Sequence, residues 1–330
     1  MATIKDIAKV CHVSASTVSK ALNGYGDIGA ETVKLVQETA RKMNYHPDAA
    51  ARLLKTNRSY SIGIVFADGA ESGLTHEYFS HILNSAKNAV EARGYDVTFI
   101  SNRIGGSSYL DHCRYRKVDG VLIACIESYN PQVLELVNSE VPVVTIDFPF
   151  EGRSCIFSDN EHDACTLMRY ILSKGHRDIA IIHGEMTEVT KKRLRGFRQA
   201  LDDYHVTITE ENILEGRYHD IESVSECVVR LLEREHRPET LLFPDDYSAI
   251  GCRSLFDEKH LHIPDDISIA GYDGVDVFQS FRPALTTLHQ DAEGIGRAAG
   301  SQLIDEIEHK VTGPKHITIG GCLYPGETIR

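Results

Sequence analysis

Hydrophobic residues in the first 45 positions recur every three or four residues in three short segments. The first begins with the capping box of Thr3 and Asp6, the second covers residues 14–23, and the third extends over about residues 30–43. A tight three-residue connection separates the first two helices, which is typical of a helix-turn-helix unit. The alternative is a small helical bundle with a polar face.

The second predicted helix has a polar outer face. Ser14 is placed to cap its N-terminus. Three apolar positions face inward, and the outer face consists of small, hydroxylated or basic residues: Ala15, Ser16, Thr17, Ser19 and Lys20. Such a face buries little against protein but can hydrogen-bond phosphates and base edges. The pattern therefore indicates a DNA recognition helix.

A further helix of only about two turns is predicted at residues 47–55, where a proline is followed by three alanines. An isolated helix shorter than about 12 residues is marginal in water. We therefore expect this segment to fold only when something holds it. The head is expected to end near residue 46, and the short helix with its linker at residue 58.

From residue 60 onward, short apolar segments of the strand type alternate with amphipathic helices. Strands are predicted at residues 62–66, 97–100, 121–124, 141–146, 179–182, 240–243 and 267–270, and helices at 76–93, 107–116, 131–138, 163–173, 190–204, 221–235, 246–259 and 291–308. This alternation is typical of doubly wound parallel sheets, so the fold class is α/β. The number of units exceeds one sheet, which predicts two subdomains with a cleft between them.

Polar side chains follow the predicted strands. Asp147, Asp245 and Asp273 come after three strands, while Arg193 lies near a helix start and Tyr218 in a loop. In open α/β sheets, ligands bind beyond the carboxyl ends of the strands. Carboxylates, a guanidinium fork and an aromatic ring together suit a polyhydroxylated ligand. Taken singly, each aspartate is more typical of a helix cap or a turn.

Charge is distributed unevenly along the chain, whose net charge is −13. Residues 1–58 contain nine Lys/Arg against five Asp/Glu, a net charge of +4, which leaves −17 for the remainder. A basic head on an acidic body confines affinity for phosphates to the head.

No apolar run of about 18 residues occurs and the N-terminus lacks an apolar signal segment, so a cytoplasmic protein without a membrane span is expected. Eight cysteines are scattered without a C-x-x-C pair, which is typical of reduced, buried thiols. Glu77 and His81 lie four residues apart and could touch a metal, but a surface pair is the better interpretation because no third ligand is in view. No metal or cofactor is predicted.

Motifs of catalysis are not evident. Neither G-x-S-x-G nor a P-loop occurs, and the dinucleotide-type match Gly294-x-Gly296-x-x-Ala299 lies inside a predicted helix. A hydrolase that uses Asp245 and Asp246 would not explain the basic head. We therefore expect no enzymatic activity. A sugar or nucleoside receptor without a DNA-regulatory role is the alternative for the body.

Five motifs occur in order along nearly the whole chain: V-S-A-S-T-V-S-K-A-L-N-G, Y-H-P-D-A-A-A-R-L-L-K, S-I-G-I-V, G-Y-D and L-T-T-L-H-Q. Together they resemble the lac repressor/gal repressor family of bacterial regulators. The resemblance implies a homodimer on a pseudo-palindromic double-stranded DNA operator, a hinge helix at the second motif, and a periplasmic-binding-protein-like core. We expect an N-subdomain of about residues 59–160 and 291–320, and a C-subdomain of about 161–290 and 321–330.

The resemblance also assigns roles to individual residues. Base-reading positions are Ala15, Ser16 and Lys20, while Leu54, with Ala51 beside it, forms an apolar wedge in the minor groove. The phosphate-contacting positions are Thr3, Ser14, Thr17, Ser19, Asn23 and Tyr45. The effector positions are Tyr78 or Phe79, Asp147, Arg193, Tyr218, Asp245 and Asp273.

The implied effector is a small molecule, most often a sugar, although other members bind purines, nucleosides or phosphorylated proteins. Four positions depart from the family pattern: Lys20 and Val33 replace common arginines, Asp48 a usual asparagine, and Pro244 a small residue. Lys20 loses the bidentate reading of guanine. No leucine-heptad tail follows Arg330, so a dimer is expected rather than a tetramer.

Overall fold

The computed structural model describes residues 2–22, 26–45, 58–66, 73–102, 108–125 and 130–330. The chain divides into two compact units, residues 1–59 and 60–330. Each unit has hydrophobic core residues of its own. The two units are called the head and the core below.

The head contains three helices: α1 (Ile4–Cys11), α2 (Ala15–Leu22) and α3 (Ala30–Lys42). Thr3 and Asp6 form the expected capping box at the start of α1, and His12 ends this helix in the left-handed conformation. Apolar side chains from all three helices meet in one small core: Ile7, Val18, Ala21, Val36 and Ala40. This is the three-helix head that the hydrophobic pattern predicts.

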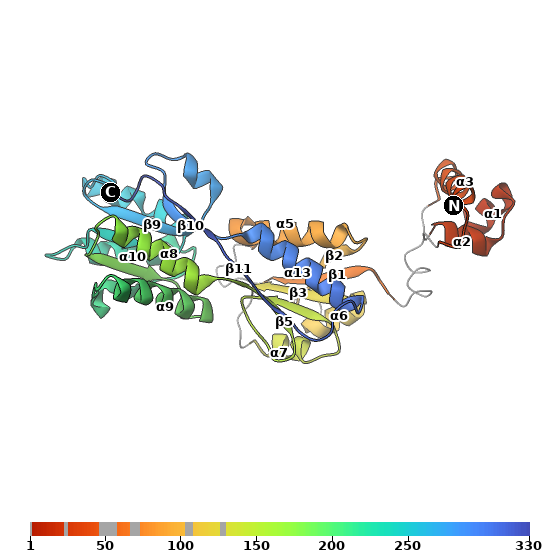
Figure 1. The fold of residues 1–330 in the computed structure, drawn as a ribbon, viewed down its shortest axis with the longest axis horizontal. Helices are drawn as coiled ribbons and strands as arrows, with labels where there is room; N and C mark the ends of the chain where they lie inside the picture. Colours follow the sequence, from red (N-terminus) through yellow and green to blue (C-terminus); the bar gives the residue numbers. More distant parts are fainter. Residues whose placement is uncertain (1, 23–25, 46–57, 67–72, 103–107, 126–129) are drawn as a thin grey trace. The chain divides into compact units, whose positions relative to one another are not determined.

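The first sheet of the core has six parallel strands in the order β11-β5-β4-β3-β1-β2. Its strands are β1 (Ser61–Phe66), β2 (Asp96–Phe99), β3 (Gly120–Cys125), β4 (Val143–Ile146), β5 (Ser154–Ser158) and β11 (His316–Ile319). One face is covered by α5 (Glu77–Glu91) and α13 (Ala292–Ile307), which lie side by side in Figure 1. The other face packs against α6 (Tyr109–Arg116) and α7 (Pro131–Val137).

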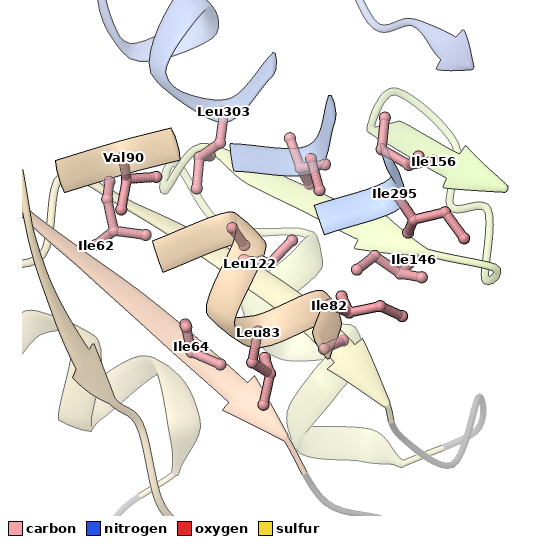
Figure 2. Packing of buried hydrophobic residues seen from close by; sticks show 14 of the residues in the cluster. Ile62, Ile64, Ile82, Leu83, Val90, Leu122, Ile146, Ile156, Ile295 and Leu303 are labelled. Atoms are coloured by element: carbon pink, nitrogen blue, oxygen red, sulfur yellow. The ribbon is translucent and has the colours of Figure 1, made fainter. Parts of the chain in front are cut away.

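Figure 2 shows the apolar layer between this sheet and its two long helices. Ile62 and Ile64 point to the same face of β1 because side chains alternate along a strand. Ile82 and Leu83 of α5 and Leu303 of α13 pack in the same cluster. The late helix α13 thus belongs to the first sheet, although the whole second sheet except β12 precedes it in the sequence.

The second sheet has the order β12-β10-β9-β8-β6-β7. Its strands are β6 (Ile179–His183), β7 (Ile213–Glu215), β8 (Thr240–Leu242), β9 (Ser268–Asp273), β10 (Thr286–His289) and β12 (Cys322–Tyr324). One face packs against α8 (Asn160–Ser173) and α9 (Glu188–Asp203). The other packs against α10 (Ile221–Leu232), α11 (Asp246–Gly251) and α12 (Arg253–Glu258). Short 3-10 turns occupy η1 (Gly73–Thr75), η2 (Glu210–Asn212) and η3 (Asp276–Ser280).

Several elements differ from the sequence prediction. The strands β5, β7, β10, β11 and β12 were not predicted, since each has only three to five residues. In addition, β5, β10 and β11 carry serine, threonine or histidine among few apolar residues. The predicted helix at 246–259 is two helices that meet at Cys252. The second sheet is not wholly parallel, because β12 pairs with β10 in the antiparallel direction. The predicted strand at 267–270 extends to Asp273.

No helix among the described residues is both long enough and apolar enough to cross a membrane. The sequence prediction of no membrane span applies to the whole chain, whereas this finding applies only to the described residues.

Candidate functional site

The polar face of α2 is organised by a cluster of hydroxyl groups. Ser14 Oγ accepts a hydrogen bond from the backbone N–H of Thr17 at 3.0 Å, so Ser14 caps the helix as predicted. The same oxygen lies 2.7 Å from Ser16 Oγ and 2.8 Å from Thr17 Oγ1. Ala15 and Ser16 are exposed, whereas Thr17 and Ser19 are half-buried. The predicted reading face is therefore at the surface of the head.

Lys20 and Asp27 form an ion pair on this surface, in which the ammonium donates to Asp27 Oδ2. Both side chains remain substantially exposed, and the hydrogen bond from Lys20 lowers the pKa of Asp27. An exposed pair of this kind is weak. A phosphate or a base can therefore compete with Asp27 for Lys20.

Other predicted DNA contacts have additional roles in the head. The Thr3 hydroxyl donates to Asp6 Oδ2 at 2.7 Å within the capping box. Tyr45 is half-buried and packs against the helical core. The predicted contacts Asn23, Ala51 and Leu54, together with most of the predicted hinge at 47–58, lie outside the described residues.

Within the core, the carboxyl ends of the two sheets meet. Ser158, the last residue of β5, donates to Gln290 Oε1 at 2.7 Å, and Gln290 Nε2 donates to Asp273 Oδ1 at 2.7 Å. The rings of His76 and His219 lie 3.8 Å apart between centroids. His76 precedes α5 of the first sheet and His219 follows β7 of the second. Side chains from both sheets therefore meet where the cleft is predicted.

Arg193 is the central cation of this cleft. It is 8% exposed, and its guanidinium carbon lies 3.7 Å from the centre of the Tyr272 ring. Its Nε donates to Asn160 Oδ1 at 2.9 Å, and its Nη1 donates to the Pro244 carbonyl at 3.3 Å. Nη2 lies 3.9 Å from Asp273 Oδ1. These contacts fix the guanidinium plane at the carboxyl end of the second sheet.

Asp273 is the buried anion opposite Arg193. Its carboxylate also lies 3.6 Å from His219 Nε2. Burial alone would raise the pKa of Asp273, but the contact with His219 and the charge of Arg193 outweigh burial and lower it. Asp273 therefore stays ionised and balances Arg193.

Asp147 lies on the side of the first sheet, directly after β4, with a left-handed φ of 61°. Its Oδ1 accepts a hydrogen bond from the Ser158 backbone N–H at 2.9 Å. Burial raises the pKa of Asp147 to about 6, against the smaller opposing effects of this hydrogen bond and the Arg193 charge. Asp147 is thus the carboxylate of the predicted set whose charge is least well compensated.

Tyr78 and Phe79 are neighbouring aromatic residues at the start of α5, with ring centroids 5.2 Å apart. The Tyr78 hydroxyl is buried and has no hydrogen-bond partner among the described residues. Burial, with the charges of Asp147 and Asp273, raises its pKa well above the ordinary value. Phe79 packs on Phe66, with ring centroids 5.4 Å apart. Tyr78 therefore offers a neutral hydroxyl to the cleft.

Asp245 and Tyr218 are more firmly engaged by the protein. Asp245 is fully buried and caps α11: its oxygens accept from the Ser248 N–H at 2.7 Å and the His219 N–H at 3.0 Å. The Tyr218 hydroxyl lies 2.9 Å from Thr190 Oγ1. A small cavity of about 10 Å³, lined by Arg193, Tyr218 and other residues of the second sheet's subdomain, has room for about one water.

Sequence reasoning missed several residues of this cleft. They are His76, Asn160, His219, Tyr272 and Gln290. Tyr272 and Gln290 were present in the motifs G-Y-D and L-T-T-L-H-Q, so their position was available as a signal. Asn160 follows the unpredicted strand β5. The two histidines carried no local signal, because their contact with each other joins segments far apart in the sequence.

Two weaker sequence matches have structural explanations. Gly294 and Gly296 lie within α13, so they form no loop around a dinucleotide. Glu77 and His81 approach to 3.9 Å as a surface pair. Across the described residues, no group of three or more His, Cys, Asp or Glu is arranged to hold a metal ion.

A pH dependence of stability follows from Asp147. Its pKa is about 6 in the folded core and about 4 when unfolded, so the folded state binds more protons between these values. The contribution of Asp147 to the stability of the folded core is therefore complete below about pH 4 and is lost as the pH rises through 6. Between pH 4 and 7 the free energy of unfolding, measured with urea, should fall on the order of 1–3 kcal/mol more in the wild type than in Asp147→Asn.

The control is Asp202→Asn, which removes an exposed carboxylate of α9. It should follow the wild-type pH profile. Burial also raises the pKa of Asp163 to about 6. Asp163 therefore lowers stability with rising pH in all three proteins alike. Identical profiles for wild type and Asp147→Asn would contradict the assignment.

Comparison with known proteins places this geometry in a family. Residues 3–48 match the family described as bacterial regulatory proteins, lacI family, and residues 168–329 match a periplasmic binding protein-like domain. The HTH-type transcriptional repressor PurR of Haemophilus influenzae is 33% identical over 320 residues, covering 95% of this chain and 93% of that protein.

Solved structures share the fold. The lac repressor dimer bound to operator and the anti-inducer ONPF has a TM-score of 0.80 at 22% identity, over 99% of both chains. The complex of the transcriptional regulator CelR with cellobiose has a TM-score of 0.73 at 22% identity, over 99% of this chain and 100% of that one. With its head and two-sheet core matched over nearly its full length, the chain belongs to the lacI family of bacterial regulatory proteins.

Proposed function

We propose that the protein is a sequence-specific DNA-binding transcriptional repressor whose operator affinity is controlled by a small molecule in the cleft of the core. The observation that carries this proposal is the combination of an exposed hydroxyl-rich helix in a basic head with a buried, charged cleft in an acidic core. A receptor without DNA function would have no use for the first feature.

In the head, α2 enters the major groove. Ala15, Ser16 and Lys20 face the base edges, because they are the small or basic side chains of its outer surface. The hydroxyls around Ser14 contact phosphates, as do Tyr45 and Thr3, the residue that caps α1. On binding, Lys20 leaves its ion pair with Asp27 and contacts DNA instead. Two heads of a homodimer then occupy two half-sites of a pseudo-palindromic operator.

In the core, the effector binds among Arg193, Asp273, Asp147 and Tyr78. Their paired acceptors and guanidinium fork suit the vicinal hydroxyls of a sugar. The regulator CelR, which shares the fold, was solved with cellobiose. Arg193 is only 8% exposed and the cavity beside it measures about 10 Å³, so a ligand of the size of cellobiose must displace the residues around Arg193 to reach its guanidinium. Binding is thereby linked to the relative position of the two subdomains.

The proposed link to DNA is the segment at residues 47–58, which joins the head to the core. It folds as a hinge helix in the operator, and a change in the cleft alters its attachment point at residue 59. Effector and operator affinities are then linked by a coupling free energy, typically about 1–3 kcal/mol. The direct test is an electrophoretic shift of the chain's own upstream region, with and without a panel of sugars and nucleosides. A shift that no member alters would contradict effector control.

Leu54→Ala tests the hinge. A leucine wedge between base steps is used only in a bent, specific complex. Losing its burial costs about 1.5–3 kcal/mol, so operator affinity should fall roughly 10- to 100-fold. Binding to unrelated DNA, measured in the same salt, should change little. Equal losses on both DNAs would contradict the wedge role.

A further inference from the structure

A cavity of about 250 Å³ adjoins the cleft at the N-termini of α5 and α13. Its walls are the first turn of α5, the segment 273–276 after β9, and the crossover segment 289–293. It shares Tyr78 and Asp273 with the proposed effector site. Unlike the space beside Arg193, it can accept a group of several atoms, near the lower limit of small-molecule sites at about 300 Å³.

The charges that line this cavity are predominantly negative. Among the described residues that line it, two are histidines and none is a lysine or arginine. Five are carboxylates: Glu77, Asp273, Asp276, Asp291 and Glu293. Helix N-termini by themselves attract anions. Here the side chains reverse that preference, because a ligand anion would meet several carboxylates at short range.

Protein groups already satisfy some of these carboxylates. Asp291 caps α13 by accepting from the Gly294 N–H at 2.7 Å, and Asp273 pairs with Arg193. Asp276 and Glu293 are exposed and come from two different segments of the cavity lining. Their negative charges are therefore available to a ligand.

Tyr78 supplies an independent sign of a ligand. Its side chain lines the cavity, the residue is only 9% exposed, and its hydroxyl has no hydrogen-bond partner among the described residues. A buried polar group left in this state costs about 1–3 kcal/mol. A hydroxyl oxygen beside carboxylates is well placed to accept from a cationic donor.

We propose that this cavity seats a protonated amine of the effector, with Tyr78 Oη accepting one N–H and the surrounding carboxylates compensating the positive charge. This rests on the proposed function and narrows its ligand class from a neutral sugar to a small ammonium-bearing molecule. The amine is carried either by an amino sugar or by a short aliphatic chain.

The experiment compares amines with neutral partners of the same shape. Full-length protein is titrated at pH 7 and constant ionic strength with D-glucosamine against D-glucose, and with ethanolamine against ethylene glycol, by ligand-observed NMR. We expect the amine of at least one pair to bind 10-fold or more tightly than its neutral partner. The first pair reports an amino sugar and the second a simple amine.

Variants locate the binding. Asp276→Asn with Glu293→Gln should reduce amine affinity about 10-fold, with the affinity for the neutral partner unchanged. Tyr78→Phe should reduce amine affinity severalfold. The matched control is Glu222→Gln with Glu226→Gln, which removes two exposed carboxylates of α10 and should change neither affinity. Equal binding within both pairs, no binding of either amine, or amine binding that the rim variant leaves intact would each overturn the inference.

Operator shifts distinguish this inference from the proposed function. Suppose that a neutral sugar changes the electrophoretic shift of the operator while neither amine binds. Effector control would then be supported, and the proposed amine-binding cavity would be contradicted. If an amine binds at the rim without changing the electrophoretic shift, the cavity binds amines, but the amine is not the effector.

Discussion

Arg193→Ala is expected to lower the free energy of unfolding of the core by about 3–5 kcal/mol, the typical cost of removing one partner of a buried ion pair. The change leaves Asp273 buried without its cation and removes the stacking on Tyr272. It also deprives Asn160 Oδ1 and the Pro244 carbonyl of their donor. Urea unfolding at pH 7 measures the loss. The same variant should bind operator DNA but show no response to the effector.

Arg195→Ala is the matched control. Arg195 lies two residues further along α9, is exposed, and pairs with Glu161 at 2.9 Å. An exposed pair contributes little, so stability should change by less than about 1 kcal/mol. Arg193→Lys keeps the charge without the planar fork and should respond more weakly to the effector. An effector response of normal size in Arg193→Ala would contradict the cleft as the binding site.

Gly296→Ala is expected to destabilise the core, although alanine is the better helix former by about 1 kcal/mol. A Cβ at this position would lie 2.1 Å from the Ile82 carbonyl oxygen and 2.9 Å from the Ala86 nitrogen of α5. Both are backbone atoms, so the two helices must move apart and loosen the packing drawn in Figure 2. Overpacking of this kind typically costs about 1–3 kcal/mol.

Gly196→Ala should act in the same direction in the second subdomain, where the added Cβ would lie 2.1 Å from the Glu161 carbonyl oxygen of α8. The control is Gly320→Ala, because nothing lies within 4 Å of a Cβ there. Stability of all three is measured by urea unfolding. If Gly296→Ala were as stable as Gly320→Ala, the contact between α5 and α13 would not limit the packing.

The elements that local pattern predicts well are those whose packing partner is adjacent in the sequence. The three helices of the head fall into this class, since Ile7, Val18 and Val36 already show the helical period. The strand β1 is similar, with four consecutive buried residues. By contrast, β11 alternates exposed and half-buried residues at a sheet edge, so its pairing with β5 leaves little mark on its own composition.

The cleft shows the same division. Arg193, Asp147 and Asp273 were predicted as site residues from strand ends and family motifs, and the structure brings Arg193 and Asp273 to 3.9 Å. Their roles as effector contacts stay predictions. Asp245 is as much a helix cap as a site residue, which is the alternative that its position after a strand suggested. His219 could be placed at the cleft only from the fold, because β7, the strand before it, was not predicted.

Sequence alone determined the helix-turn-helix head, the α/β class of the core and the uneven charge, because each depends on residue type and short-range spacing. The tertiary structure decided which carboxylates are compensated: Asp273 by Arg193 and His219, and Asp147 by much less. It also decided that the cavity beside Arg193 holds about 10 Å³, whereas the cavity beside Tyr78 holds about 250 Å³. The physical reason is that burial and charge pairing depend on distances between segments up to about 200 residues apart, such as Tyr78 and Asp273, and these distances exist only once both sheets have formed.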